Sequence, residues 1–167
     1  MPKRILLCDD EIHILRAAEF KLKRAGYDVQ TAGDGEEAWE LIEAQRPDVL
    51  VTDYQMPRLD GFGLTQRVRE NSDTRDLPVL MLTAKGFELS REELAEKWNV
   101  MAVVAKPFSP RELLQTVEKI LAREPIPVQA EGLGFRVQDS RMDGWPKMLP
   151  SHILNPEPSS LTPGRNL

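Results

Sequence analysis

Short, largely apolar runs alternate with stretches of helical spacing along the first 122 residues. The apolar runs predict strands at residues 5–8, 27–31, 49–52, 79–82 and 100–105. Between and after them, apolar residues recur three or four positions apart, which predicts helices around residues 12–22, 38–42, 64–68, 90–98 and 113–121. The pattern therefore predicts five strand-helix units.

The predicted strands are apolar throughout rather than at alternate positions. Such strands are buried on both faces, and with helices between them they indicate an α/β fold, a doubly wound parallel sheet covered on each side. The residues at the boundaries agree with this pattern. Gly26 follows the first helix, Asp34 precedes the second, and Ser109 with Pro110 is a typical helix start.

The composition changes after residue 122. Of the 167 residues, 41% are hydrophobic and 29% are charged, which is ordinary for one globular domain. Residues 123–167, however, contain seven of the 13 prolines and few long apolar patterns. We therefore predict a domain over residues 1–122 and a Pro-rich C-terminal tail over 123–167 that is disordered or loosely docked. Docking through the apolar stretches 132–137 and 145–149 is the alternative.

Charge and cysteine content limit the classes of function. The formal net charge is -5 and the isoelectric point is about 5.2, which argues against direct nucleic-acid binding and against a polybasic membrane patch. The apolar run after the basic residues 1–4 is too short for a signal peptide, so we expect a cytoplasmic protein. Cys8 is the single cysteine, and its apolar surroundings predict a buried, inert thiol.

Polar residues cluster at the carboxyl ends of the predicted strands. In an open parallel sheet these ends meet at one edge, where ligands bind. The residues at these positions are three carboxylates, a hydroxyl and an ammonium: Asp9, Asp10, Asp53, Thr83 and Lys106. Any one of the acids could simply cap a helix, and Lys106 alone could be a surface charge. Together they suit a hard divalent cation and a phosphoryl group.

Other kinds of site are less compatible with the sequence. A dinucleotide would need a G-x-G-x-x-G turn after the first strand, and the acids found there would repel a pyrophosphate. His13 and His152 have no Cys or His companions at metal-ligand spacing, so they are better interpreted as solvated or packed side chains. No Ser-His-Asp or Cys-His arrangement is evident.

Four motifs, LLCDDE, VLVTDYQMPRLDGFGL, VLMLTA and VVAKPF, occur in this order. Together they closely resemble the receiver domain of bacterial two-component response regulators, of the chemotaxis-regulator type. The resemblance covers roughly residues 3–122. It implies a flavodoxin-like fold whose five-stranded parallel sheet has the order 2-1-3-4-5.

The resemblance also implies roles for the acidic residues. Asp53 is the residue that corresponds to the phosphoacceptor of the family. Asp9 and Asp10 correspond to the Mg²⁺ ligands, and the backbone carbonyl of Gln55 corresponds to a further ligand. The crowded acids of ILLCDDE are then explained as a cation site whose carboxylates repel one another, and so destabilise the fold, when no cation is bound.

Thr83 and Lys106 correspond to the residues that bind the phosphoryl oxygens, and the Lys106–Pro107 peptide is expected to be cis. Two positions depart from the common pattern. Val103 stands where the family often has an aromatic switch residue. We therefore expect either a graded, partial shift or a response carried by movement of the loop of residues 84–90, with Phe87 as the nearest aromatic. Lys85 and Gln55 occupy positions that tune dephosphorylation in the family.

The function that these inferences imply is a signalling module with non-enzymatic output, which catalyses only its own phosphorylation and dephosphorylation. It would accept a phosphoryl group from a histidine kinase or a histidine phosphotransfer protein and change its affinity for an unknown downstream protein, or for a second copy in a phosphorylation-linked dimer. The alternative is a phosphorylation-independent interaction module. An aspartyl-phosphate hydrolase of another family would need a second Asp two positions after Asp53, where Gln55 stands.

Overall fold

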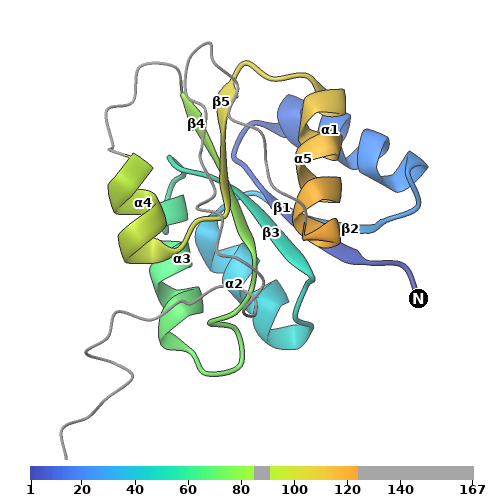
Figure 1. The fold of residues 1–167 in the computed structure, drawn as a ribbon. Helices are drawn as coiled ribbons and strands as arrows, with labels where there is room; N and C mark the ends of the chain where they lie inside the picture. The colour runs from blue at the N-terminus through green and yellow to red at the C-terminus, as the bar shows by residue number, and fades with distance from the viewer. Residues whose placement is uncertain (85–90, 124–167) are drawn as a thin grey trace, which may run out of the picture.

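The computed structural model describes residues 1–84 and 91–123, which form alternating strands and helices (Figure 1). The elements in chain order are β1 (Arg4–Cys8), α1 (Ile12–Arg24), β2 (Asp28–Ala32), α2 (Gly35–Ala44), β3 (Val49–Asp53), α3 (Gly61–Glu70), β4 (Val79–Ala84), α4 (Arg91–Trp98), β5 (Ala102–Lys106) and α5 (Pro110–Ala122). The alternation that the hydrophobic pattern predicts is confirmed.

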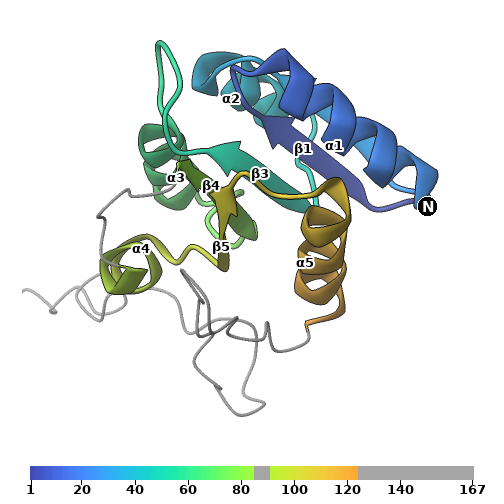
Figure 2. The same ribbon diagram turned by 90° about the horizontal axis from the view of Figure 1, so that it is seen from above.

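All strand pairs in the sheet are parallel, and the strand order is β2-β1-β3-β4-β5. The chain therefore winds in both directions from β1, as the flavodoxin-like prediction requires. Helices α1 and α5 cover one face of the sheet, and α2, α3 and α4 cover the other (Figures 1 and 2). This order places the carboxyl ends of β1, β3, β4 and β5 next to one another at one edge.

The core consists of two apolar layers, one on each face of the sheet. On the first face, α1 and α5 pack against β1, β3, β4 and β5 through residues that include Leu15, Leu22, Leu113 and Val117. On the second, α2, α3 and α4 contribute buried side chains that include Ile42, Leu64, Val68 and Leu94. Strand β3 is buried along its whole length, which explains why its sequence is apolar up to Thr52 and Asp53.

The predicted helix boundaries have the expected hydrogen bonds. The Asp34 side chain accepts hydrogen bonds from the backbone N–H groups of Glu36 and Glu37 at the start of α2. The Ser109 hydroxyl accepts one from the Glu112 N–H at the start of α5, where Pro110 is the first helical residue. These caps fix the ends of the helices next to the sheet edge that carries the acids.

Strand β5 begins two residues later than the sequence pattern predicts. Asn99 has a positive φ of 50°, which ends α4, and the N–H of Val100 donates to the Leu94 carbonyl. Val100 is buried in the layer beneath α4 rather than in the sheet. Its apolar side chain therefore belongs to the packing of the helix end, and an apolar residue at a helix end cannot be told from a strand residue by periodicity.

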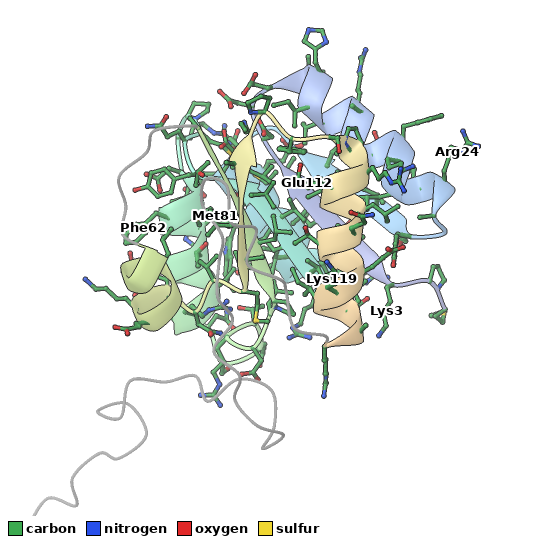
Figure 3. All side chains as sticks on the ribbon, turned by 45° about the horizontal axis from the view of Figure 1, so that its top comes forward. Lys3, Arg24, Phe62, Met81, Glu112 and Lys119 are labelled. Atoms are coloured by element: carbon green, nitrogen blue, oxygen red, sulfur yellow. The ribbon has the colours of Figure 1, made fainter. Side chains whose placement is uncertain are left out.

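Arg69 at the end of α3 joins three backbone segments. Its guanidinium donates hydrogen bonds to the carbonyls of Trp98, Asn99, Arg75 and Leu77 at distances of 2.7–3.0 Å. Burial lowers its pKa to about 10, and the Asp76 carboxylate opposes that shift. Nearby, the rings of Phe62 and Trp98 meet edge to face with centroids 4.6 Å apart, and Figure 3 shows Phe62 beside α4. The end of α4 is therefore anchored to α3.

Several expectations concern residues 85–90 and 124–167, which lie outside the described residues. They include Lys85, the switching role of Phe87 and the state of the tail. Within the described residues, no helix combines the length and the apolar character needed to span a membrane.

Candidate functional site

The carboxyl-terminal edge of the sheet brings most of the predicted site residues together. Asp53 ends β3, Lys106 ends β5, and Asp9 follows β1 directly. The pairing of Asp53 with Leu82 and of Ala84 with Lys106 puts Thr83 between the acid and the ammonium along this edge. The inference that strand ends converge therefore agrees with the observed geometry.

Lys106 is the centre of the charge cluster. Its Nζ lies 2.8 Å from Asp9 Oδ2, 3.2 Å from Asp53 Oδ2 and 2.9 Å from Glu11 Oε1. The side chains of Asp9, Asp53 and Lys106 are 1%, 8% and 13% exposed. Buried charges at this spacing must neutralise each other, because desolvation of an isolated carboxylate is very costly.

The three predicted metal-ligand carboxylates are close enough to share one cation. Oxygen atoms of Asp9, Asp10 and Asp53 all lie within 4.8 Å of one another. Among the described residues, Asp9 Oδ2 is buried without a hydrogen bond of regular geometry, although it forms the ion pair with Lys106. An all-oxygen donor set suits a hard cation such as Mg²⁺. The residues present therefore fit the metal that the resemblance implies.

The pKa values of the site reflect burial and crowding. Burial, and then the Asp9 carboxylate, raise the pKa of Asp53, although Lys106 opposes the shift. Burial likewise raises the pKa of Asp9, against the hydrogen bond from Lys106. Burial lowers the pKa of Lys106, but hydrogen bonds to Asp9 and Glu11 reverse this and raise it above its ordinary value. The surroundings therefore favour the charged form of Lys106 and disfavour the charged forms of Asp9 and Asp53.

The loop after β3 is held close to the acids by backbone contacts. The N–H of Tyr54 donates to the Leu82 carbonyl, and the N–H of Gly61 donates to the Tyr54 carbonyl. A Cβ at Gly61 would overlap the Asp53 carbonyl, so only glycine permits this approach. Gln55, whose carbonyl is the further predicted ligand, lies in this loop immediately after Tyr54. The loop conformation thus fixes the backbone beside the predicted acceptor.

A second anchor joins the same loop to α2. Arg58 has a positive φ of 66°, and its guanidinium pairs with the Asp34 carboxylate, which also caps α2. This ion pair lowers the pKa of Asp34, after the larger effect of the backbone hydrogen bond from Glu37. On the other side of the site, the Lys106–Pro107 peptide is cis, as expected.

Cys8 lies beneath the site and has the properties predicted for it. Its thiol donates to the Asp34 carbonyl and contacts the Met56 sulfur. Burial raises its pKa, so the reactive thiolate is suppressed at neutral pH. Val103, which replaces the common aromatic, is half-buried on β5 and packs against the layer formed by α2, α3 and α4.

Sequence reasoning did not assign a role to Glu11. It belongs to the acidic run of ILLCDDE, yet the resemblance gives roles to Asp9 and Asp10 only. The structure places its carboxylate on Lys106, 95 positions away in the sequence. The available signal was its position just before α1, where a long acidic side chain is a poor helix cap.

Comparison with known proteins agrees with this geometry. The model of the response regulator receiver domain matches residues 5–118, and the chain belongs to this family. It is thus a receiver domain of two-component signalling, as its motifs predict.

Similar proteins include transcriptional regulators. The probable transcriptional regulator ycf27 of Cyanophora paradoxa is 42% identical over 125 residues, which are 75% of this chain and 51% of that protein. The alkaline phosphatase synthesis transcriptional regulatory protein PhoP of Bacillus subtilis is 38% identical over 153 residues, which are 91% of this chain and 62% of PhoP. The chain therefore spans about half of the first relative and less than two thirds of the second.

Solved structures show the same fold. A putative response regulator from Chloroflexus aurantiacus superposes with a TM-score of 0.67 at 40% identity, covering 74% of this chain and 100% of the other. The chemotaxis protein CheY4 of Vibrio cholerae gives a TM-score of 0.67 at 32% identity, covering 72% of this chain and 100% of CheY4. The flavodoxin-like prediction is therefore confirmed for the part of the chain that these structures cover.

Proposed function

We propose that this chain accepts a phosphoryl group on Asp53 from a histidine kinase or a histidine phosphotransfer protein, and that phosphorylation changes its affinity for a downstream protein. The observation that carries the proposal is the ion pair between the Asp53 carboxylate and the Lys106 ammonium, 3.2 Å apart. The carboxylates of Asp9 and Asp10 lie beside it. This combination supplies a nucleophile, a fixed positive charge and ligands for a cation. We expect the reaction to take place in the cytoplasm.

The transfer step balances with the groups at this edge. An oxygen of the ionised Asp53 carboxylate attacks phosphorus, a P–O bond forms, and the P–N bond to the donor imidazole breaks. The leaving imidazole keeps the bonding electron pair and takes a proton from solvent. Lys106 holds one phosphoryl oxygen as a compact point charge, and the Thr83 hydroxyl donates to another.

Asp9, Asp10, Asp53 and the Gln55 carbonyl are the residues we propose to hold Mg²⁺. When bound there, Mg²⁺ would neutralise the charge that donor and acceptor share. Within the chain, Lys106 opposes the rise that burial causes in the pKa of both Asp9 and Asp53, and Asp53 is oriented at the end of a buried strand. The output of the module is a change in binding, and the only reactions that it catalyses are its own phosphorylation and dephosphorylation.

The proposal is tested by incubation with acetyl phosphate and Mg²⁺. We expect the intact mass to increase by one phosphoryl group, and peptide mapping to place the group on Asp53. Asp53→Asn should remain unmodified, because an amide is not a nucleophile. Asp48→Asn, at the opposite end of β3, is the matched control and should be modified like the original protein.

Modification that persists in Asp53→Asn would refute the assignment. No modification of the original protein by either acetyl phosphate or a histidine kinase would favour the phosphorylation-independent interaction module instead. The relatives are named as transcriptional regulators. For residues 1–122 we propose a protein partner and no direct contact with DNA, because the chain is acidic overall.

We also propose that residues 1–122 fold as an independent domain, distinct from the Pro-rich tail. A chain that ends at Arg123, whose left-handed backbone caps α5, is expected to unfold cooperatively and to accept phosphate like the full chain. The reason is that, among the described residues, those within 5–120 already form a buried apolar layer on each face of the sheet. Urea unfolding of the two chains measures this, and loss of a cooperative transition would show that the tail completes the core.

A further inference from the structure

We propose that Glu11 is a positioning residue that holds Lys106 in the empty site and competes with the phosphoryl group for its ammonium. This inference rests on the proposed function, because it assumes that a phosphoryl group arrives on Asp53. It gives the third acid of ILLCDDE a role distinct from those of the predicted metal ligands. In this role Glu11 sets how readily the site accepts and keeps a phosphoryl group.

The first observation is that Glu11 occupies a cap position without capping. It precedes α1, yet its side chain makes no hydrogen bond to the helix. The residues that precede α2, α3 and α5, namely Asp34, Asp60 and Ser109, all accept hydrogen bonds from their helices. The Glu11 carboxylate instead lies 2.9 Å from Lys106 Nζ.

The second observation is how Glu11 is aimed at Lys106. Its backbone N–H donates to Asp9 Oδ1 at 2.8 Å, which fixes the start of its side chain beside the buried acid. Asp9 Oδ1 thus accepts a hydrogen bond from the turn that carries Glu11, while Oδ2 faces Lys106. The turn that ends β1 therefore presents two carboxylates to one ammonium.

The third observation is the number of donors. An ammonium has three N–H bonds, and in this structure it faces three carboxylates, those of Asp9, Glu11 and Asp53. A phosphoryl oxygen can be bound by Lys106 only if one of these contacts is given up. The side chain of Glu11 is 59% exposed, whereas those of Asp9 and Asp53 are 1% and 8% exposed.

Exposure determines which contact is released. A buried carboxylate that loses its partner keeps its desolvation cost, whereas an exposed one is solvated by water. When Asp53 is phosphorylated, a phosphoryl oxygen replaces its carboxylate at Lys106. Of the two carboxylates that remain, the exposed Glu11 is the one that can move away and free the Lys106 ammonium for the phosphoryl group. While it stays in place it shields Lys106 from incoming anions, so its removal should favour the phosphorylated state.

The test compares three variants at saturating Mg²⁺. Glu11→Gln removes the charge, and Glu11→Asp keeps the charge but is one methylene too short for the same contact. Glu19→Gln removes an equal charge from α1, where Glu19 pairs with Lys23 away from the site. The readouts are the affinity for beryllofluoride, a phosphoryl mimic, from amide NMR titration, and the rate of modification by acetyl phosphate.

We expect Glu11→Gln and Glu11→Asp to bind beryllofluoride about twofold to fivefold more tightly, the range expected from the loss of one exposed ion pair. Glu19→Gln should behave like the original protein. If Glu11→Asp also behaves like the original protein, the effect is simple charge repulsion and the proposal is overturned. Unchanged affinity in Glu11→Gln overturns it as well.

Failure of the role proposed for Glu11 can be distinguished from failure of the proposed function. If the original protein is modified on Asp53 but all Glu11 variants match it, only the role of Glu11 fails. If the original protein is not modified and does not bind beryllofluoride, the proposed function itself fails. Both Glu11 variants should fold normally, since Glu11 makes no cap bond and Asp is a better residue at this position.

Discussion

Replacing Lys106 with methionine is expected to lower the free energy of unfolding by about 3 kcal/mol in the absence of divalent cations, and to abolish phosphorylation. Methionine has a similar length but no charge. It would leave the carboxylates of Asp9 and Asp53 buried without their cation, although both lie within 3.2 Å of Lys106 Nζ in the structure. A charge that is buried and unpaired is among the most destabilising features that a protein can contain.

The same reasoning predicts that Mg²⁺ stabilises the Lys106→Met variant more than it stabilises the original protein. In the variant, a bound cation would be the only positive charge close to the two acids. Urea unfolding with and without Mg²⁺ measures both effects. A second substitution, Asp53→Asn, should restore part of the stability that Lys106→Met loses, because it removes one of the two unpaired charges.

The pH dependence follows from the raised pKa values of Asp9 and Asp53. Loss of Lys106 raises both further above their unfolded values, so the folded variant binds protons more readily than its unfolded chain. The variant is therefore least stable at pH values above the pKa that these carboxyls have in the folded protein. Its stability increases as the pH falls toward the pKa that they have in the unfolded chain. The stability difference from the original protein should narrow on acidification. A difference that is constant with pH would mean that the lost packing of the lysine, not its charge, is responsible.

The geometry of the strand ends explains why much of this site can be predicted from sequence. Strand β3 is apolar until Thr52 and Asp53, and in a parallel sheet the end of such a strand is always at the ligand-binding edge. Asp9 and Lys106 follow the same rule on β1 and β5. The strand order does not follow from this rule. The resemblance of the motifs to receiver domains predicts it, and the observed order β2-β1-β3-β4-β5 confirms it.

Features that depend on side-chain direction could not be predicted in this way. Glu11 reaches Lys106 across 95 positions; its place before α1 indicates a poor helix cap, but no local pattern indicates that its partner is Lys106. Val100 has the composition of a strand residue but packs under the end of α4. Arg69 resembles any basic residue in the last turn of a helix. Its guanidinium nevertheless donates to backbone carbonyls before β4 and at the end of α4. In each case the partner is determined by the packing of separate elements.

Arg69 is accordingly expected to be a major determinant of stability. Its guanidinium donates to four backbone carbonyls, which belong to Arg75 and Leu77 before β4 and to Trp98 and Asn99 at the end of α4. Arg69→Met keeps the apolar stem but leaves these carbonyls without their donor, and each buried acceptor that goes unpaired costs about 1–3 kcal/mol. Because water reaches some of them, we expect a total loss of about 3 kcal/mol.

Arg67 provides a matched control on the same helix. It is an arginine two positions away that pairs with the half-exposed Glu36 carboxylate and lies over the Trp39 ring. Arg67→Met should cost less than about 1 kcal/mol, as is usual for exposed ion pairs. Arg69→Lys should be intermediate, because an ammonium has three donors and cannot reach all four carbonyls.

Urea unfolding distinguishes the arginine variants, and amide exchange locates the effect. Exchange in Arg69→Met should be faster in α4 and at the start of β5 than in α1 and α5, because the lost bonds anchor the end of α4 to α3. If Arg69→Met and Arg67→Met lose similar stability, the hydrogen bonds to the carbonyls contribute little and the arginine acts only through its apolar stem. If the loss is large but exchange rises evenly over all helices, Arg69 supports the whole core and does not specifically anchor α4.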